Sequence, residues 1–220
     1  MIILALDTST RYAGVGLVCG DRANSTRIWR SEQNHGRELL PRALELLSEA
    51  GIAASNLTHI AVALGPGGFS ALRVGISAAI GLSLPKSLPV IGVSTFDIEF
   101  ELFSGWASQT TPVIAAVPAG RGELAWAAYE ATGTPVATGL SSPDRLVADA
   151  THKSLFCGEG ALQLAGLLDP ARILCGSAPT RSPLTLADIA VSRLAAGTPL
   201  AVVRPVYARE PSTTSPPHVV

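Results

Sequence analysis

The sequence predicts an α/β protein made of two similar lobes, and three observations support that prediction. Three strands followed by a helix, a strand and a second helix are expected twice in succession along the chain. A glycine-rich turn at residues 65–68 connects an apolar strand-like run to an uncharged helix. With 220 residues, of which 47% are hydrophobic, the chain is large enough to bury the core that two lobes need.

Apolar residues that recur with the period of a strand or of a helix define the elements of the first half. Gly51 ends the leucine-rich helix, because glycine favours the end of a helix. The expected elements are strands at 2–7, 13–19 and 25–30, a helix at 38–50, a strand at 60–64, a helix at 72–84 and a strand at 90–93.

The second half repeats this order, although the two halves share little sequence. Its turns are marked by glycine and proline. The expected elements are strands at 112–117, 124–129 and 136–140, a helix at 144–150, a strand at 155–157, a helix at 161–168, a strand at 173–175 and a helix at 186–196.

Two lobes in which three antiparallel strands lead into a mixed sheet describe the architecture of actin-like and Hsp70-like ATPases and sugar kinases. We therefore predict an α/β fold with two duplicated lobes of this actin-like (ASKHA, RNase H-like) type. The first lobe is expected at residues 1–104 and carries the partner-binding helices, and the second is expected at 105–210. Residues 211–220, which are rich in Pro, Ser and Thr, are predicted to be disordered.

The composition argues against several functional classes. A net charge of −1 gives no basic footprint for strong, independent nucleic-acid binding. The high apolar content predicts that a partner covers part of the surface. The three cysteines have no metal-ligand or disulfide spacing and are expected to be reduced. Without a signal-peptide pattern or an apolar run long enough to cross a bilayer, a cytoplasmic protein is predicted.

Asp7 ends the first strand, and Thr8 and Ser9 follow it. A carboxylate and hydroxyls in this place could meet the metal and phosphates of a nucleotide, with Gly67 letting the backbone approach the phosphates. The same residues could instead form a hydroxyl-capped turn and the shortest route from strand to helix. The sequence leaves both interpretations open.

Most of the chemistry that an ATPase or metalloenzyme needs is missing from the sequence. Pro118 stands where the second lobe would need an acid for metal-assisted phosphoryl transfer. The glycine turn lacks the lysine of a P-loop, and Ser70 stands where a dinucleotide motif needs glycine. No two histidines have helical metal-ligand spacing. We therefore predict no catalytic residues and no metal site.

The two helices of the first half point to another role. After Arg73 the second helix carries no charge up to residue 84, so it should be buried on more than one side. The two helices could cover each other beside the sheet, but we favour an interface shared with a partner or a second copy. The predicted interface residues are His35, Leu39, Leu40, Ala43, Leu47, Arg73, Ile76, Ala79 and Ile80.

Four segments of the chain stand out: LALDTS at 4–9, His35 with LLP at 39–41, GPGGFSALRVG at 65–75 and PVYAR at 205–209. These segments resemble the TsaB (YeaZ) family, and the resemblance runs from residue 3 to about residue 209. The departures are Gly68, Ser70 and Ala71, where the family usually reads GPGSFTGLR, and Pro118, where an acid is common.

The resemblance implies a non-catalytic paralogue of TsaD that acts as a scaffold or activator. TsaD, assisted by TsaE, would transfer a threonylcarbamoyl group to adenosine 37 of tRNA. Thr95 and Glu99 stand where TsaD carries its metal-binding histidines. The expected partners are TsaD in a heterodimer, TsaE, and a second copy in a homodimer, with tRNA bound only through the complex. No cofactor of its own is expected, and ATP or ADP with Mg²⁺ at the complex interface is left open.

Two alternative functions are kept. A small actin-like ATPase or sugar kinase would turn over nucleotide through Asp7. A glycoprotease-type metallopeptidase would hold a stoichiometric metal ion, which the missing histidine pair disfavours.

Overall fold

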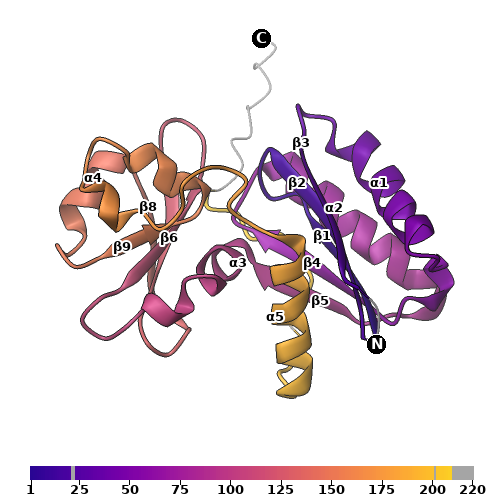
Figure 1. Ribbon diagram of the computed structural model, residues 1–220. Coiled ribbons are helices and arrows are strands. Elements are labelled where there is room, and N and C mark those ends of the chain that lie inside the picture. The colour runs from indigo at the N-terminus through magenta and orange to yellow at the C-terminus, as the bar shows by residue number, and fades with distance from the viewer. Residues whose placement is uncertain (21–22, 201, 210–220) are drawn as a thin grey trace, which may run out of the picture.

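The computed structural model describes residues 1–20, 23–200 and 202–209, and the predicted tail at 211–220 lies outside them. The described residues form two β-sheets that lie beside each other, each with helices against it (Figure 1). None of the described helices is long and apolar enough to cross a membrane.

The first sheet has five strands in the order β3-β2-β1-β4-β5. β2 is antiparallel to both of its neighbours, β1 and β3, whereas β4 and β5 continue the sheet on the other side of β1 and run parallel to it. Every residue of β1 after Ile2 is buried, as expected for a central strand covered on both faces. The strands are β1 (Ile2–Asp7), β2 (Tyr12–Cys19), β3 (Ser25–Arg30), β4 (His59–Gly65) and β5 (Val90–Ser94).

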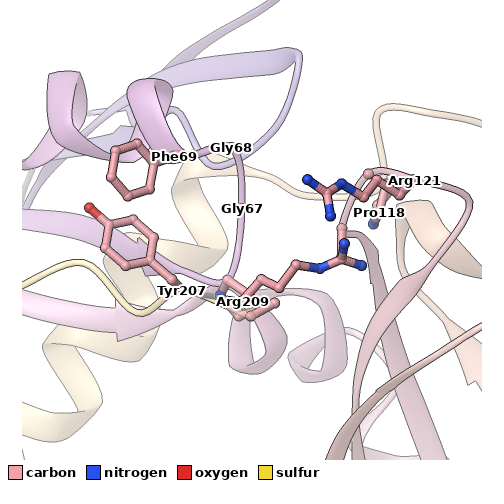
Figure 2. A pocket seen from close by; sticks show the side chains of 11 residues that line it. Gly67, Gly68, Phe69, Pro118, Arg121, Tyr207 and Arg209 are labelled. Atoms are coloured by element: carbon pink, nitrogen blue, oxygen red, sulfur yellow. The ribbon is translucent and has the colours of Figure 1, made fainter. Parts of the chain in front are cut away.

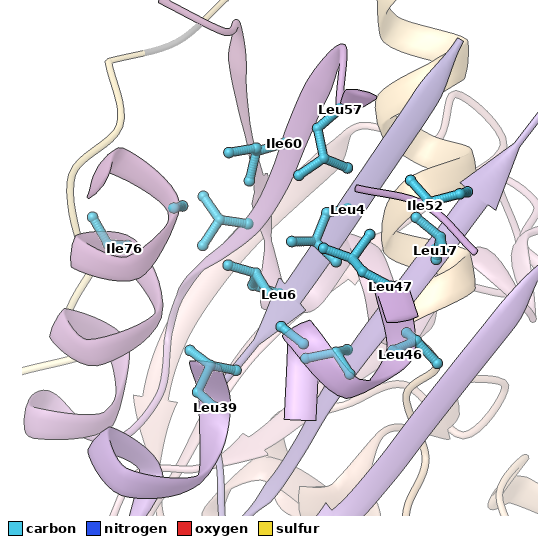
Figure 3. Packing of buried hydrophobic residues seen from close by; sticks show 14 of the residues in the cluster. Leu4, Leu6, Leu17, Leu39, Leu46, Leu47, Ile52, Leu57, Ile60 and Ile76 are labelled. Carbon is cyan, nitrogen blue, oxygen red and sulfur yellow. The ribbon is translucent and has the colours of Figure 1, made fainter. Parts of the chain in front are cut away.

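Helices α1 (His35–Glu49) and α2 (Phe69–Ser83) cover the outer face of this sheet, away from the second sheet (Figure 1). Because side chains alternate along a strand, Leu4 and Leu6 of β1 point to this face and pack with Leu39, Leu46 and Ile76 (Figure 3).

The opposite face is covered by α5 (Pro183–Ala195), with Ile98 of α3 (Thr95–Glu101) in the same core cluster. Ile3 and Ala5, the alternate residues of β1, pack there. Ser182 caps α5 by accepting a hydrogen bond from the Leu184 N–H at 3.2 Å. The lobe boundary between residues 104 and 105 remains a prediction, but α5, which lies beyond it, completes the core of the first sheet.

The second sheet repeats the pattern in shorter form, in the order β8-β7-β6-β9. Strands β6, β7 and β8 are antiparallel, and β9 adds in parallel to β6. Its elements are β6 (Val113–Pro118), β7 (Leu124–Tyr129), β8 (Pro135–Ser141), α4 (Pro143–Asp149) and β9 (Leu155–Cys157). Antiparallel strands that lead into parallel ones, in both sheets, confirm the predicted actin-like architecture.

Two predicted elements of the second half were wrong. The helix expected at 161–168 is a 3₁₀ segment, η4 (Glu159–Leu164), and Gly158 and Gly166 on either side of it have φ of 92° and 88°, outside the helical region. The strand expected at 173–175 is reduced to one bridge between Phe156 and Ile173. The other 3₁₀ turns are η1 (Ala54–Asn56), η2 (Leu84–Lys86), η3 (Ser104–Trp106) and η5 (Pro170–Arg172).

Candidate functional site

The glycine turn packs tightly against the end of β1. The Gly68 N–H donates to the Ser9 carbonyl at 2.8 Å, and any Cβ at Gly67 would overlap that carbonyl. The Thr8 hydroxyl donates to the Ala71 carbonyl at 2.6 Å, in space that the missing side chain of Gly75 leaves free. The glycines therefore let α2 begin in direct contact with the end of β1.

Asp7, Thr8 and Ser9 are all buried, with exposed fractions of 3%, 1% and 0%. One oxygen of Asp7 accepts hydrogen bonds from the Ser9 N–H at 2.8 Å and from the Ser9 hydroxyl. The other accepts from Arg181 Nε at 2.9 Å. The structure thus brings the four residues predicted near a nucleotide together, but the protein itself uses both oxygens of the carboxylate. Their proximity to a nucleotide stays a prediction.

Arg181 is the centre of a buried polar cluster that sequence reasoning missed. Its guanidinium donates to Glu99 Oε1 at 2.7 Å and to Thr10 Oγ1 at 2.7 Å, besides its bond to Asp7. Glu159 Oε2 lies 3.5 Å from the same guanidinium. Residue 181 is far from its partners in sequence and lies in a loop with no motif, so no local pattern could have found it. We call Arg181, Asp7, Thr10, Glu99 and Glu159 the Arg181 cluster.

Burial raises the pKa of Glu99, and the charge and hydrogen bonds of Arg181 only partly oppose that rise. For Arg181 burial acts in the opposite direction, but Asp7 and Glu99 outweigh it and keep the pKa of the guanidinium above its ordinary value. The Oε2 atom of Glu99 and the Oγ1 atom of Thr95, four residues earlier on α3, are buried without a hydrogen-bond partner among the described residues.

The two cysteines nearest the cluster have little nucleophilic character. Burial is the main cause that raises the pKa of Cys157 well above its ordinary value, and the pKa of Cys175 to about 11. Both thiols are therefore protonated near neutral pH. Among the described residues, no group of three or more His, Cys, Asp or Glu side chains is arranged to hold a metal ion.

A pocket of about 520 Å³ opens between the two sheets, next to the glycine turn. Figure 2 shows Phe69 and Tyr207 on one side of it, with Arg121 and Arg209 reaching in from other directions. Arg209 also forms an ion pair with Glu123. Pro118 lies in the wall, and none of the described residues that line the pocket is acidic, so this part of the pocket suits an anionic group better than a metal ion.

The predicted interface on α1 and α2 needs correction at five positions. Leu39, Ala43, Leu47, Ile76 and Ala79 are at most 5% exposed, because they pack between the two helices and the sheet. They present no surface to a partner.

The other predicted interface residues differ in exposure. His35 is 9% exposed, and its Nε2 lies 3.0 Å from the Thr10 carbonyl. Leu40, Arg73 and Ile80 are exposed.

An exposed apolar surface nevertheless remains on these helices. Leu44 and Leu84, which the prediction left out, are 51% and 71% exposed. Leu40 and Leu44 are four residues apart on one side of α1, but Leu39, Ala43 and Leu47 have the same spacing, so the exposed and buried sets separate only once the helix lies against its sheet. Small exposed residues, Ser77 and Gly81, lie on α2. We call this surface the two-helix face: Leu40, Leu44, Arg73, Ile80 and Leu84.

Three comparisons relate the chain to known proteins. Residues 30–165 match the family described as TsaD, tRNA N6-adenosine threonylcarbamoyltransferase. The tRNA threonylcarbamoyladenosine biosynthesis protein TsaB of Escherichia coli K12 is 34% identical over 131 residues, which cover 59% of this chain and 55% of that protein. TsaB of Buchnera aphidicola (Schizaphis graminum) is 30% identical over 139 residues, 63% of this chain and 65% of that protein. The chain thus spans between half and two thirds of the length of these relatives.

Among solved structures, YeaZ from Pseudomonas aeruginosa is similar over almost its whole length. The TM-score is 0.77 at 27% sequence identity, and the match covers 94% of this chain and 99% of that one. The similarity therefore includes both sheets and the segments that join them.

Proposed function

Since this chain belongs to the TsaB (YeaZ) family, within the wider threonylcarbamoyltransferase group, we propose that it is a non-catalytic subunit in the formation of N6-threonylcarbamoyladenosine in tRNA. It acts as a scaffold and activator of TsaD, together with TsaE, and binds tRNA only through their complex. We place it in the cytoplasm, where it meets TsaD as a heterodimer or itself as a homodimer. ATP or ADP with Mg²⁺ would bind where the subunits meet.

The two-helix face is the observation that carries this proposal. Its leucines and isoleucine are 40–71% exposed, with Leu40 and Leu44 on α1, Ile80 on the neighbouring α2 and Leu84 directly after α2. Such surfaces on soluble proteins mark contacts with other proteins. This chain matches the family described as TsaD, so TsaD as a partner should have a similar fold. It could then present a similar pair of helices to the two-helix face.

The state of Asp7 supports a non-catalytic role over the ATPase alternative. An actin-like ATPase would need this carboxylate free to reach a metal-bound phosphate, whereas here Arg181 and Ser9 occupy both oxygens. The metallopeptidase alternative fares worse, because Thr95 and Glu99 stand at the positions of the metal ligands and Glu99 is bonded to Arg181.

Reconstitution tests the proposal. Supplied with an activated threonylcarbamoyl donor, purified TsaD and TsaE should transfer the group to tRNA much faster when this protein is added, and this protein alone should transfer none. Transfer by this protein alone would contradict the non-catalytic assignment. Equal rates with and without it would contradict the role of activator.

The face itself is tested by Leu40→Asp and Ile80→Asp, which place a charge on exposed positions. Both variants should fold as the wild type does and lose co-purification with TsaD, because an unpaired carboxylate in an apolar contact is costly. Val136→Asp is the matched control, since Val136 is 55% exposed on β8 of the second sheet. If Leu40→Asp and Ile80→Asp retain TsaD as well as Val136→Asp does, the partner binds elsewhere.

A further inference from the structure

The Arg181 cluster joins residues that are far apart in the sequence and belong to different parts of the fold. Asp7 and Thr10 lie at the end of β1 in the first sheet, and Glu159 begins η4 beside the second sheet. Glu99 lies on α3, where the chain leaves the first sheet for the second. Arg181 lies just before α5, where the chain has returned. The Arg181 side chain is only 3% exposed. Its guanidinium therefore contacts residues beside both sheets, and it also joins the two segments of the chain that connect the sheets.

The cluster is bonded internally as well as to Arg181. The Thr10 hydroxyl donates to Glu159 Oε2 at 2.6 Å, which links the first sheet to η4 directly. The Thr180 hydroxyl donates to Glu99 Oε1 at 2.8 Å, and the Glu159 N–H donates to the same oxygen at 3.1 Å. These bonds connect the two crossings to each other and to the second lobe.

Charge explains why this arrangement should be rigid. The buried carboxylates of Asp7 and Glu99 and the partly buried carboxylate of Glu159 face a single buried guanidinium, and a buried charge without a partner is very unfavourable. If the lobes moved apart, Glu159 would leave while Asp7 and Arg181 stayed, and several hydrogen bonds would break together. The cluster is satisfied only when the two lobes keep their present relation.

We propose that Arg181 is an internal latch that holds the two lobes closed. The carboxylates of the cluster need a positive charge nearby, and Arg181, a residue of the same protein, supplies it. The relation of the lobes is then a property of the folded chain alone and does not depend on a bound ligand. The latch concerns the isolated protein, so it is independent of any partner.

Arg181→Lys tests the latch, because lysine keeps the charge but cannot donate to Asp7, Glu99 and Thr10 at once. Nitroxide labels at Ser48→Cys on α1 and Thr132→Cys after β7, both exposed positions, report the distance between the lobes when Cys175 is replaced by Ala. The labelled protein that keeps Arg181 should give one narrow distribution of distances between the labels, and adding ATP and Mg²⁺ should leave it unchanged. Arg181→Lys should lose that narrow distribution while its far-ultraviolet circular dichroism stays unchanged.

Arg172→Lys is the matched control. Arg172 donates to the Ser154 and Thr151 carbonyls within the second lobe and does not join the lobes. A narrow distribution that survives Arg181→Lys would overturn the latch, as would equal broadening in Arg172→Lys. An Arg181→Ala variant should regain the narrow distribution with added methylguanidinium, which restores the missing group, and failure of that rescue in folded protein would also overturn it.

Discussion

The Arg181 cluster and the two-helix face invert the usual placement of residues. In the cluster, Arg181 is buried between the lobes and pairs with the buried carboxylates of Asp7 and Glu99 and with the partly buried carboxylate of Glu159. On the two-helix face, leucines and an isoleucine stay exposed on helices whose inner sides are fully packed. The charges of the cluster meet partners within the chain, whereas the face has apolar area that a partner would cover. Under the proposed function, the exposed face rather than the buried carboxylates carries the role of the protein.

Removing the charge of Arg181 should have the largest effect on this comparison. Arg181→Leu leaves the buried carboxylates of Asp7 and Glu99, and the partly buried carboxylate of Glu159, without their cation. We expect the free energy of unfolding to fall by about 3–5 kcal/mol, measured by urea denaturation. Arg193→Leu is a control, since Arg193 pairs with Asp97 at 2.6 Å but is 33% exposed. A loss no larger than that of the control would mean that the cluster is not a major source of stability.

Adjacent residues of α1 separate the packed side from the two-helix face. Leu39 is 0% exposed and Leu40 is 40% exposed. Leu39→Ala should lower the free energy of unfolding by about 2–5 kcal/mol, because it leaves a cavity. Leu40→Ala should change it by less than about 0.5 kcal/mol and instead weaken association with TsaD. If both substitutions destabilise the isolated chain equally, Leu40 is part of the core and the face is smaller than described.

The pH dependence of stability tests the charge in the cluster. The pKa of Glu99 is raised above its ordinary value of 4.5, so the folded chain holds a proton that the unfolded chain releases. Its contribution is therefore full below pH 4.5 and is lost as the pH rises through the raised value. Relative to Glu99→Gln, the wild type should therefore lose free energy of unfolding over that range, measured by urea denaturation at a series of pH values.

Glu101→Gln, an exposed substitution on the same helix, is the control for this measurement. The change in the pH dependence of unfolding should be larger for Glu99→Gln than for Glu101→Gln. If Glu99→Gln changes it no more than Glu101→Gln does, the side chain of Glu99 does not take up a proton on folding in this range.

The fold was predictable from the sequence to a greater extent than the site was. Hydrophobic period gave the five strands of the first sheet and its two long helices, because local pattern decides them. The same apolar content could not tell Leu39 from Leu40 until the helix was set against its sheet. Arg181 lay beyond sequence reasoning altogether, since only the fold brings it to Asp7, 174 residues away.

The smallest expected effect concerns the link between the interlobe pocket and the two-helix face. Tyr207 stacks on Phe69 with ring centroids 4.5 Å apart, and both line the pocket. Arg73 of the face lies 3.9 Å over the Phe69 ring, and its Nε donates to the Tyr207 hydroxyl at 3.0 Å. The C-terminal segment therefore helps to hold Arg73 in place.

Tyr207→Phe removes the accepting hydroxyl and keeps the stacked ring. Because one exposed hydrogen bond contributes little, association with TsaD should weaken by only about threefold, roughly 0.5–1 kcal/mol. The effect should vanish in an Arg73→Ala background, since Tyr207 acts through that side chain, and isothermal calorimetry on all four proteins measures this coupling. A loss that persists without Arg73 would mean that Tyr207 reaches the partner by another route, and the pocket and the face would then be independent.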